Sequence, residues 1–390
     1  MAVPARPTLR ARPWLALAGI VLLGADCAHA QARRERRRER QEKRKAEAAA
    51  PATPAAAPGL VARIRTLKEG GSRLDWVDDK IAFDMLGSDR VFNIYVMRAD
   101  GSNVKCLTCG HPDLPRRNIG QPAWHPAGRY LVFQAEKGQH RKLRFGHVTT
   151  PGAGVLNDLW ALDTQANRAT LIREVKDAPG QGTLHPHFSA DGSMLSWSEM
   201  KEKGGLSRKQ QLGYWQLMVA DFRVEGGRPR LSNVRAHEPG GTAFYENHGF
   251  SPDGRHLIFT SNFEGRRRAD YDIYTVDLRT RQRTRLTHED YNEHAQYSPD
   301  GRHIVWMTNR GNPKGGTDYW VMNADGSNKR RLTHFNVKGH PDYAGRKISV
   351  ADFAWKPDGT AIAGYSGGKV LFESETDPPK IMLVELRPLR

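Results

Sequence analysis

The chain has 390 residues and a formal net charge of +17, with 60 Lys and Arg against 43 Asp and Glu. This charge favours polyanionic partners, but no motif typical of nucleic-acid-binding proteins accompanies it, so nucleic acid is not an expected partner. Part of the charge lies in an N-terminal segment that precedes the expected fold.

The first 30 residues have the pattern of a secretory signal peptide. Three arginines precede an apolar run from Trp14 to Ala25, and Ala28-His29-Ala30 forms a small-x-small cleavage site. The apolar run is too short for a comfortable membrane span. We therefore predict that residues 1–30 are a cleaved signal peptide, that the protein is periplasmic or secreted, and that no transmembrane segment remains after cleavage.

Residues 31–59 have the composition of a linker. They hold nine Lys and Arg and four Glu, followed by a tract of Ala and Pro, and nothing in them can bury an apolar core. We predict a basic, disordered linker here and a folded domain over residues 60–390. The basic character favours attraction to an anionic polymer or to a membrane surface.

One residue pattern recurs along the folded region: a polar residue, an aromatic residue, a Pro or small residue, a turn ending in Gly, and an apolar strand. Pro presets φ for the turn, Asp binds its own backbone, and Gly accepts a positive φ. The copies are at 121–133, 185–197, 247–259, 294–306 and 352–364, with a degenerate copy at 73–83. Repeats of this length built from strands predict an all-β propeller of six blades.

The strands that follow these hairpins predict how the ring closes. Six third strands follow the six hairpins, but only five fourth strands follow those, and the chain ends at Arg390 without a sixth. Residues 60–67 have strand character and precede the first hairpin. We predict that this N-terminal strand pairs with the last blade and closes the ring, which protects the exposed strand edges.

The repeats resemble a known family. The "SPDG" hairpins, together with "RADGSNVKCLT" and "NADGSNKRRLTH", are similar to the propeller of the periplasmic TolB protein and its relatives. The resemblance covers nearly all of residues 73–390 and implies a TolB-like six-bladed β-propeller. The chain shows no counterpart of the separate N-terminal domain of TolB. Such blades occur in binding modules and in enzymes, so the repeats are specific for architecture rather than for function.

Polar residues occupy the start of every predicted inner strand, seven positions before the turn glycine. In a propeller, these strand starts lie together at one mouth of the central channel. The predicted channel-mouth residues are Arg73, Gln121, Asn247, Glu293 and Asp352, together with the histidines His185, His187, His248 and His294. One interpretation is a wet channel mouth, where polar side chains are expected without a specific role.

The second interpretation is a metal site formed by the four histidines. His185-Pro186-His187 places two imidazoles on one side of a strand, and imidazole is the commonest metal ligand in proteins. We predict zinc or manganese as the divalent ion, although no cofactor is certain. The "HPH" segment is also similar to the metal-binding histidines of propeller-fold oligogalacturonate lyases. That resemblance implies lyase chemistry on an acidic polysaccharide, with Gln181 as a candidate ligand and Arg266, Arg267 and Arg268 on the basic face.

Two functions therefore stay open. The first is an exported TolB-like propeller that acts as a binding module for a protein or envelope polymer through its long loops, which lie on the face opposite the glycine turns. The alternative is a metal-dependent lyase or hydrolase that acts on an anionic polysaccharide at the channel mouth. The sequence does not decide whether the protein is an enzyme, what its oligomeric state is, or whether Cys106 and Cys109 form a disulfide.

Overall fold

A computed structural model of the chain describes residues 59–138, 146–203, 212–265, 270–312, 315–368 and 377–389. The predicted signal peptide, most of the predicted linker and Arg266, Arg267 and Arg268 lie outside these residues. The described residues contain no α-helix and one 3-10 helix, η1 (Gly146–Thr149). None of their helices has the length and apolar character needed to cross a membrane.

Within the described residues, 24 strands form six antiparallel sheets of four strands each. Blade 1 contains β2 (Gly71–Val77), β3 (Lys80–Leu86), β4 (Phe92–Arg98) and β5 (Lys105–Cys106). Blade 2 contains β6 (Ile119–Trp124), β7 (Tyr130–Glu136), β8 (Asn157–Asp163) and β9 (Arg168–Arg173). Blade 3 contains β10 (Gly182–Phe188), β11 (Met194–Glu202), β12 (Tyr214–Glu225) and β13 (Arg228–His237).

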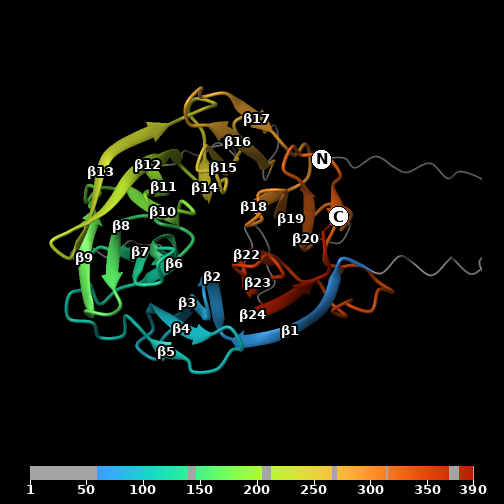
Figure 1. Ribbon diagram of the computed structural model, residues 1–390, viewed down its shortest axis with the longest axis horizontal. Helices are drawn as coiled ribbons and strands as arrows, with labels where there is room; N and C mark the ends of the chain where they lie inside the picture. The colour runs from blue at the N-terminus through green and yellow to red at the C-terminus, as the bar shows by residue number, and fades with distance from the viewer. Residues whose placement is uncertain are drawn as a thin grey trace, which may run out of the picture. The chain divides into compact units, whose positions relative to one another are not determined.

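The second half of the ring repeats the same order. Blade 4 contains β14 (Tyr245–Phe250), β15 (His256–Ser261), β16 (Asp272–Asp277) and β17 (Arg283–Arg285). Blade 5 contains β18 (Asn292–Tyr297), β19 (His303–Thr308), β20 (Asp318–Asn323) and β21 (Arg330–Arg331). Blade 6 contains β22 (Val350–Trp355), β23 (Ala361–Gly368), β24 (Asp377–Leu386) and β1 (Val61–Glu69). Figure 1 shows the blades arranged in a ring, with the first strand of each repeat innermost.

The N-terminal strand closes the ring, as the count of strands predicts. β1 pairs antiparallel with β24, with Ile64 opposite Val384 and Arg65 opposite Leu383. The amide of Arg387 also donates to the carbonyl of Leu60, at 2.8 Å. Blade 6 therefore combines strands from both ends of the folded region, which lie side by side in Figure 1. The predicted all-β, six-bladed propeller closed by an N-terminal strand is confirmed.

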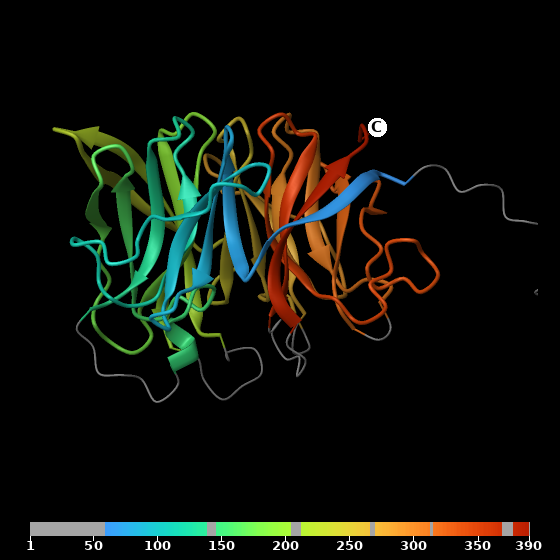
Figure 2. The same cartoon turned by 90° about the horizontal axis from the view of Figure 1, so that it is seen from below.

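The turn glycines act as the repeat pattern predicts. In blade 5, the Gly301 amide donates to the Ser298 carbonyl at 2.8 Å, and Gly301 has a φ of 71°. The Ser298 hydroxyl donates to the Asp300 carboxylate at 2.6 Å, so the turn satisfies its own polar groups. These turns lie at the end of each inner strand, opposite the channel mouth formed by the strand starts. In the side view of Figure 2, η1, which is part of the connection between β7 and β8, lies below the strands, on the lower face of the ring.

Apolar side chains between neighbouring blades form the core. In one cluster, Val77 and Ile94 of blade 1 pack with Leu131 and Phe133 of blade 2, and three of these four are fully buried. Burial of such a side chain stabilises the fold by about 1.5–3 kcal/mol.

Outside the core, Cys106 and Cys109 are joined by a disulfide, with their Cα atoms 5.7 Å apart, which answers the question that their spacing left open.

Every inner strand has an irregular register with its neighbour. In blade 3 the pairing with β11 breaks between Leu184 and His187, and in blade 5 the pairing with β19 breaks between Glu293 and Gln296. His185 and His294 lie in these breaks with φ near 50°, a left-handed conformation that is uncommon outside glycine. Such bulges change the direction of the side chains at a strand end. They set the geometry of the channel mouth.

Removal of β1 tests the closure. Deletion of residues 60–69 exposes the outer edge of β24 and leaves its hydrogen-bonding groups unpaired, so we expect the melting temperature to fall by at least about 10 °C. Thermal unfolding followed by circular dichroism measures this change. A truncation that removes residues 31–57 and keeps β1 is the matched control and should melt within a few degrees of the full chain. Equal melting of both truncations would contradict the closure.

Asp75 links blades 1 and 2, and its burial gives stability a dependence on pH. Its carboxylate accepts the Trp124 amide at 2.6 Å and the Trp76 amide at 2.8 Å. Burial raises the pKa of Asp75 to about 7, against the hydrogen bonds from these two amides. Because this pKa is higher in the folded than in the unfolded chain, protonation of Asp75 raises the free energy of unfolding. This contribution is fully present below pH 4 and is lost as the pH rises through 7.

Substitution of Asp75 removes this dependence. Between pH 5 and pH 8, the melting temperature of Asp75→Asn should therefore rise relative to that of the wild type, because only the wild type must bury a charge at the higher pH. Asp79→Asn, which changes an exposed carboxylate paired with Arg98, is the control and should keep a constant difference. A constant difference for Asp75→Asn as well would disprove the assignment.

Candidate metal centre

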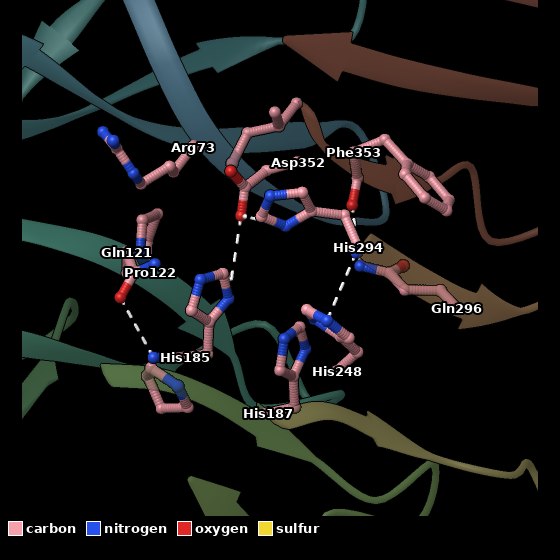
Figure 3. A pocket seen from close by; sticks show the side chains of 12 residues that line it. Arg73, Gln121, Pro122, His185, His187, His248, His294, Gln296, Asp352 and Phe353 are labelled. Atoms are coloured by element: carbon pink, nitrogen blue, oxygen red, sulfur yellow. Dashed lines mark hydrogen bonds and ion pairs between the residues drawn. The ribbon is translucent and has the colours of Figure 1, made fainter. Parts of the chain in front are cut away.

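The channel mouth contains a pocket lined by residues of all six blades. Its volume is about 20 Å³ for a water-sized sphere, room for roughly one ion or one water molecule. The lining consists of Arg73, Leu74, Gln121, Pro122, His185, Pro186, His187, His248, His294, Gln296, Asp352 and Phe353. Figure 3 shows His185, His248, His294 and Asp352 gathered on one side of the pocket, with the guanidinium of Arg73 directed away from them.

Three histidines from neighbouring blades form the centre of this pocket. His185 on β10, His248 on β14 and His294 on β18 each offer a ligand atom, and these atoms all lie within 4.8 Å of one another. The ring centroids are 5.4–5.6 Å apart. The rings of His185 and His248 are buried, at 5% and 4% exposure. The blades thus bring together residues that are more than 100 positions apart in the sequence.

Carboxylates alternate with these histidines. His185 Nε2 lies 2.8 Å from Glu246 Oε1, and His185 Nδ1 lies 3.7 Å from Asp352 Oδ1. The same Asp352 oxygen lies 3.4 Å from His294 Nδ1, while His294 Nε2 lies 3.8 Å from Glu293 Oε2. The centre therefore consists of histidine rings held between acidic groups.

The contacts between histidines and carboxylates shift the pKa values of these groups in opposite directions. Burial disfavours a charged His185, but the Glu246 and Asp352 carboxylates outweigh it and raise the pKa of His185. Burial likewise opposes the charge of Glu246, yet His185 beside it lowers the pKa of this carboxyl. The pKa of Asp352 is lowered in the same way by His294 and His185, against its burial. Glu246 and Asp352 are thus ionised at neutral pH, and they favour the charged form of His185.

Other ionisable groups of the centre keep their neutral forms. Burial, with the neighbouring His185, lowers the pKa of His187 to about 3. Burial also lowers the pKa of His248 well below its ordinary value. Burial and the charge of Glu246 raise the pKa of Glu293 well above its ordinary value, and the Tyr291 hydroxyl donates to it. The protonated form of Glu293, next to His294, is therefore favoured.

The residues present fit a divalent metal ion. Bonds from zinc to imidazole nitrogen are about 2.0–2.1 Å, so ligand atoms on one ion are roughly 3–4 Å apart, and the three histidines are close to that separation. His294 Nδ1 is buried and has no hydrogen-bond partner among the described residues. His248 contacts the Thr260 hydroxyl through Nε2 at 2.8 Å, the kind of contact that orients a ligating imidazole.

The remaining predicted residues occupy different places around the centre. Arg73 lines the pocket and lies 3.5 Å from the buried Asp84. Gln121 lines it too, and its side-chain oxygen accepts the His185 amide at 3.0 Å. His187 lines the pocket with its ring 6.4 Å from that of His185, but it does not belong to the close three-histidine group.

Asn247 and Gln181 lie outside the pocket lining. The Asn247 amide donates to the His185 carbonyl at 2.9 Å and to the Ser196 hydroxyl at 3.0 Å, so it ties blade 4 to blade 3. In blade 4 the residue with positive φ is Gly249, two positions later than His185 and His294 in their blades, and the pocket receives His248. The Gln181 amide donates to backbone carbonyls of Gly180 and Lys201.

Sequence reasoning missed Glu246, which has the shortest contact to a histidine of the centre. The sequence repeat does contain a signal for this residue. Glu246 stands eight positions before Gly254, and Glu293 stands eight positions before Gly301. The two carboxylates therefore occupy equivalent places in neighbouring repeats, and an alignment that included this position would have placed both beside the histidines.

The fold and the histidine centre define a six-bladed β-propeller with a polar channel mouth. No family profile matches the chain, and no curated protein matches it. Among solved structures it is similar to TolB from Acinetobacter baumannii, with a TM-score of 0.51 and 15% identity over 79% of this chain. The match spans 63% of that TolB chain. The predicted TolB-like propeller fold is confirmed.

Two further solved structures are similar to the chain. XC5397 from Xanthomonas campestris, described as a gluconolactonase, has a TM-score of 0.51 and 14% identity, with 86% of this chain and 93% of that chain covered. An oligogalacturonate lyase in complex with manganese has a TM-score of 0.47 and 14% identity, with 84% and 95% covered. At these identities the similarity shows the fold alone.

Glu246→Gln tests the centre without changing a histidine. The substitution removes the negative charge beside His185 and His248 and keeps the shape of the side chain, so we expect the affinity for zinc to fall about 10–100-fold. Isothermal titration calorimetry measures the affinity. Glu238→Gln, which changes a partly exposed glutamate paired with Lys201, is the matched control. An unchanged zinc affinity in Glu246→Gln would argue against a metal at this place.

Proposed function

We propose that this chain is an exported propeller that holds a divalent metal ion, zinc or manganese, at its channel mouth and acts as a lyase or hydrolase on an anionic saccharide. The observation that carries the proposal is the convergence of His185, His248 and His294 inside one pocket with carboxylates between them. A bound ion supplies a Lewis acid that polarises an oxygen of the ligand.

The residues around the histidines support an acidic ligand. Arg73 lies in the pocket lining with a side chain that is 21% exposed, so its guanidinium can meet a carboxylate that enters from the mouth. A guanidinium binds carboxylates with two parallel hydrogen bonds. Gln121 Nε2 also lines this region and has no hydrogen-bond partner among the described residues. Together they offer donors to an anionic group beside the ion.

A carboxyl with a raised pKa lies beside the pocket. Glu293 lies 3.8 Å from His294 Nε2, and burial raises its pKa well above the ordinary value, while Asp352, whose pKa is lowered, lies near the other nitrogen of the same ring. Groups whose pKa values are pushed apart in one site are typical of acid–base chemistry. This pairing favours a reaction that moves a proton over simple retention of an ion.

Metal content and turnover test the proposal together. Protein expressed without a histidine tag should contain about one equivalent of zinc or manganese per chain more than the double variant His185→Ala and His248→Ala. The wild type should release unsaturated or reducing ends from an acidic polysaccharide such as polygalacturonate or alginate, and the variant should be inactive. Circular dichroism confirms that the variant folds. Equal metal content in both proteins would refute the proposal.

A second candidate function is a binding module for an envelope protein or polymer. The observation that favours it is the long connection from β21 to β22, which runs from residue 332 to residue 349 and enters the channel-mouth face. Long irregular loops gathered on one face of a scaffold are the usual place for recognition. Capture of the same envelope partner by the wild type and by the double histidine variant would favour this function over catalysis.

A further inference from the structure

A second group of potential metal ligands lies in the loop between β21 and β22. His334, His340 and Asp342 each offer a ligand atom, and these atoms all lie within 4.8 Å of one another. The two rings are stacked, with centroids 4.0 Å apart and an angle of 10° between their planes. His340 and Asp342 are about one-third exposed, so an ion from solvent can reach them. This loop group shares no residue with the channel mouth.

The base of the loop is held in place by buried hydrogen bonds. The carboxylate of Asp318, which is fully buried, accepts the Thr333 hydroxyl at 3.0 Å and the Phe335 amide at 2.8 Å. These two residues flank His334 on both sides. The backbone that carries the first histidine is therefore fixed before any ion binds, which lowers the cost of binding.

The two ends of the loop are also joined to each other. The Asn336 side chain donates to the Ile348 carbonyl at 3.0 Å and accepts the Ile348 amide at 2.9 Å. Within the loop, the His340 amide donates to the Val337 carbonyl and the Val337 amide to the His334 carbonyl, both at 3.1 Å. Backbone contacts thus bring His340 back toward His334, six residues earlier.

The distances within the group suit a shared ion. His340 Nδ1 and Asp342 Oδ2 are 3.6 Å apart, too far for a hydrogen bond and close to the separation of two ligands on one metal. The Asp342 amide now donates to the same Nδ1 at 3.1 Å and would give way to an ion there. Two imidazoles and one carboxylate are a donor set for zinc and similar transition metals rather than for calcium or magnesium.

We propose that His334, His340 and Asp342 form a second divalent-metal site, which takes zinc or a similar transition-metal ion. Three protein ligands leave one coordination position open to solvent or to an anionic group of a ligand. The ion fixes the body of the loop, residues 337–347, against its hydrogen-bonded base. Since this loop leads into β22, which carries Asp352, the site orders the chain segment that enters the channel mouth.

Zinc titration of the full chain in the His185→Gln and His248→Gln background tests the site apart from the channel mouth. Calorimetry should detect one zinc ion per chain in this background. His334→Ala together with His340→Ala should weaken this binding at least tenfold, and the single variant His340→Ala, at a partly exposed position, should do the same if the double variant does not fold. His288→Ala, which removes an exposed histidine elsewhere, should leave the affinity unchanged.

Hydrogen exchange provides a second readout. Zinc should slow exchange of amides in residues 337–347 in the background protein and leave them unchanged in the loop variants. Zinc affinity within twofold of the background in His334→Ala with His340→Ala, or exchange unaffected by zinc, overturns the proposal. Either result leaves the channel-mouth function untouched, because that function is read from the metal lost on substitution of His185 and His248.

Discussion

The pairing of β1 with β24 is the contact on which the rest of the structure depends. It joins the two ends of the folded region in one sheet and makes an open row of blades into a ring. The channel mouth exists only in the closed ring, because Arg73 of blade 1 must face Asp352 of blade 6 across this junction. A propeller has no central helix or single core that would hold the blades together otherwise, so closure supplies both stability and the site.

The charges at the mouth explain why a cation suits it. Glu246 and Asp352 are buried with lowered pKa values, and these carboxylates raise the pKa of His185. Buried like charges are costly, and burial together with Glu246 raises the pKa of Glu293, which favours its neutral form. A divalent ion that binds His185 in place of a proton would balance the negative charge of the same carboxylates. Its bonds to the ligand atoms would stabilise the centre further. The acidic side chains thus favour an ion at the histidines.

Much of the fold could be predicted from the sequence, because its cause is local. Each turn needs Pro, Asp or Gly at fixed positions, and six copies of this chemistry reveal the number of blades. Closure by residues near 60–67 followed from the unequal count of strands. The faces of the ring followed as well, since a hairpin turn and the start of its inner strand must lie at opposite ends.

The site was less predictable, because its geometry depends on bulges that the repeat pattern does not encode. A strand with regular alternation would project equivalent residues of each repeat into the channel. The position of the left-handed residue differs between blades, being His185 and His294 in blades 3 and 5 but Gly249 in blade 4. As a result His248 lines the pocket, whereas Asn247 turns into the contact between blades. The backbone conformation therefore decides whether Asn247 or His248 lines the pocket.

The two histidine groups differ in what holds them, and this difference bears on their roles. The channel-mouth histidines come from three blades, so any change in how the blades pack moves them relative to one another. The loop histidines are six residues apart on one segment whose base is bound to Asp318 and Ile348. The group that spans blades is buried and lies among carboxylates, which is the environment that the proposed chemistry on a ligand needs. The loop group is local and partly exposed, which suits the proposed ordering of its own segment.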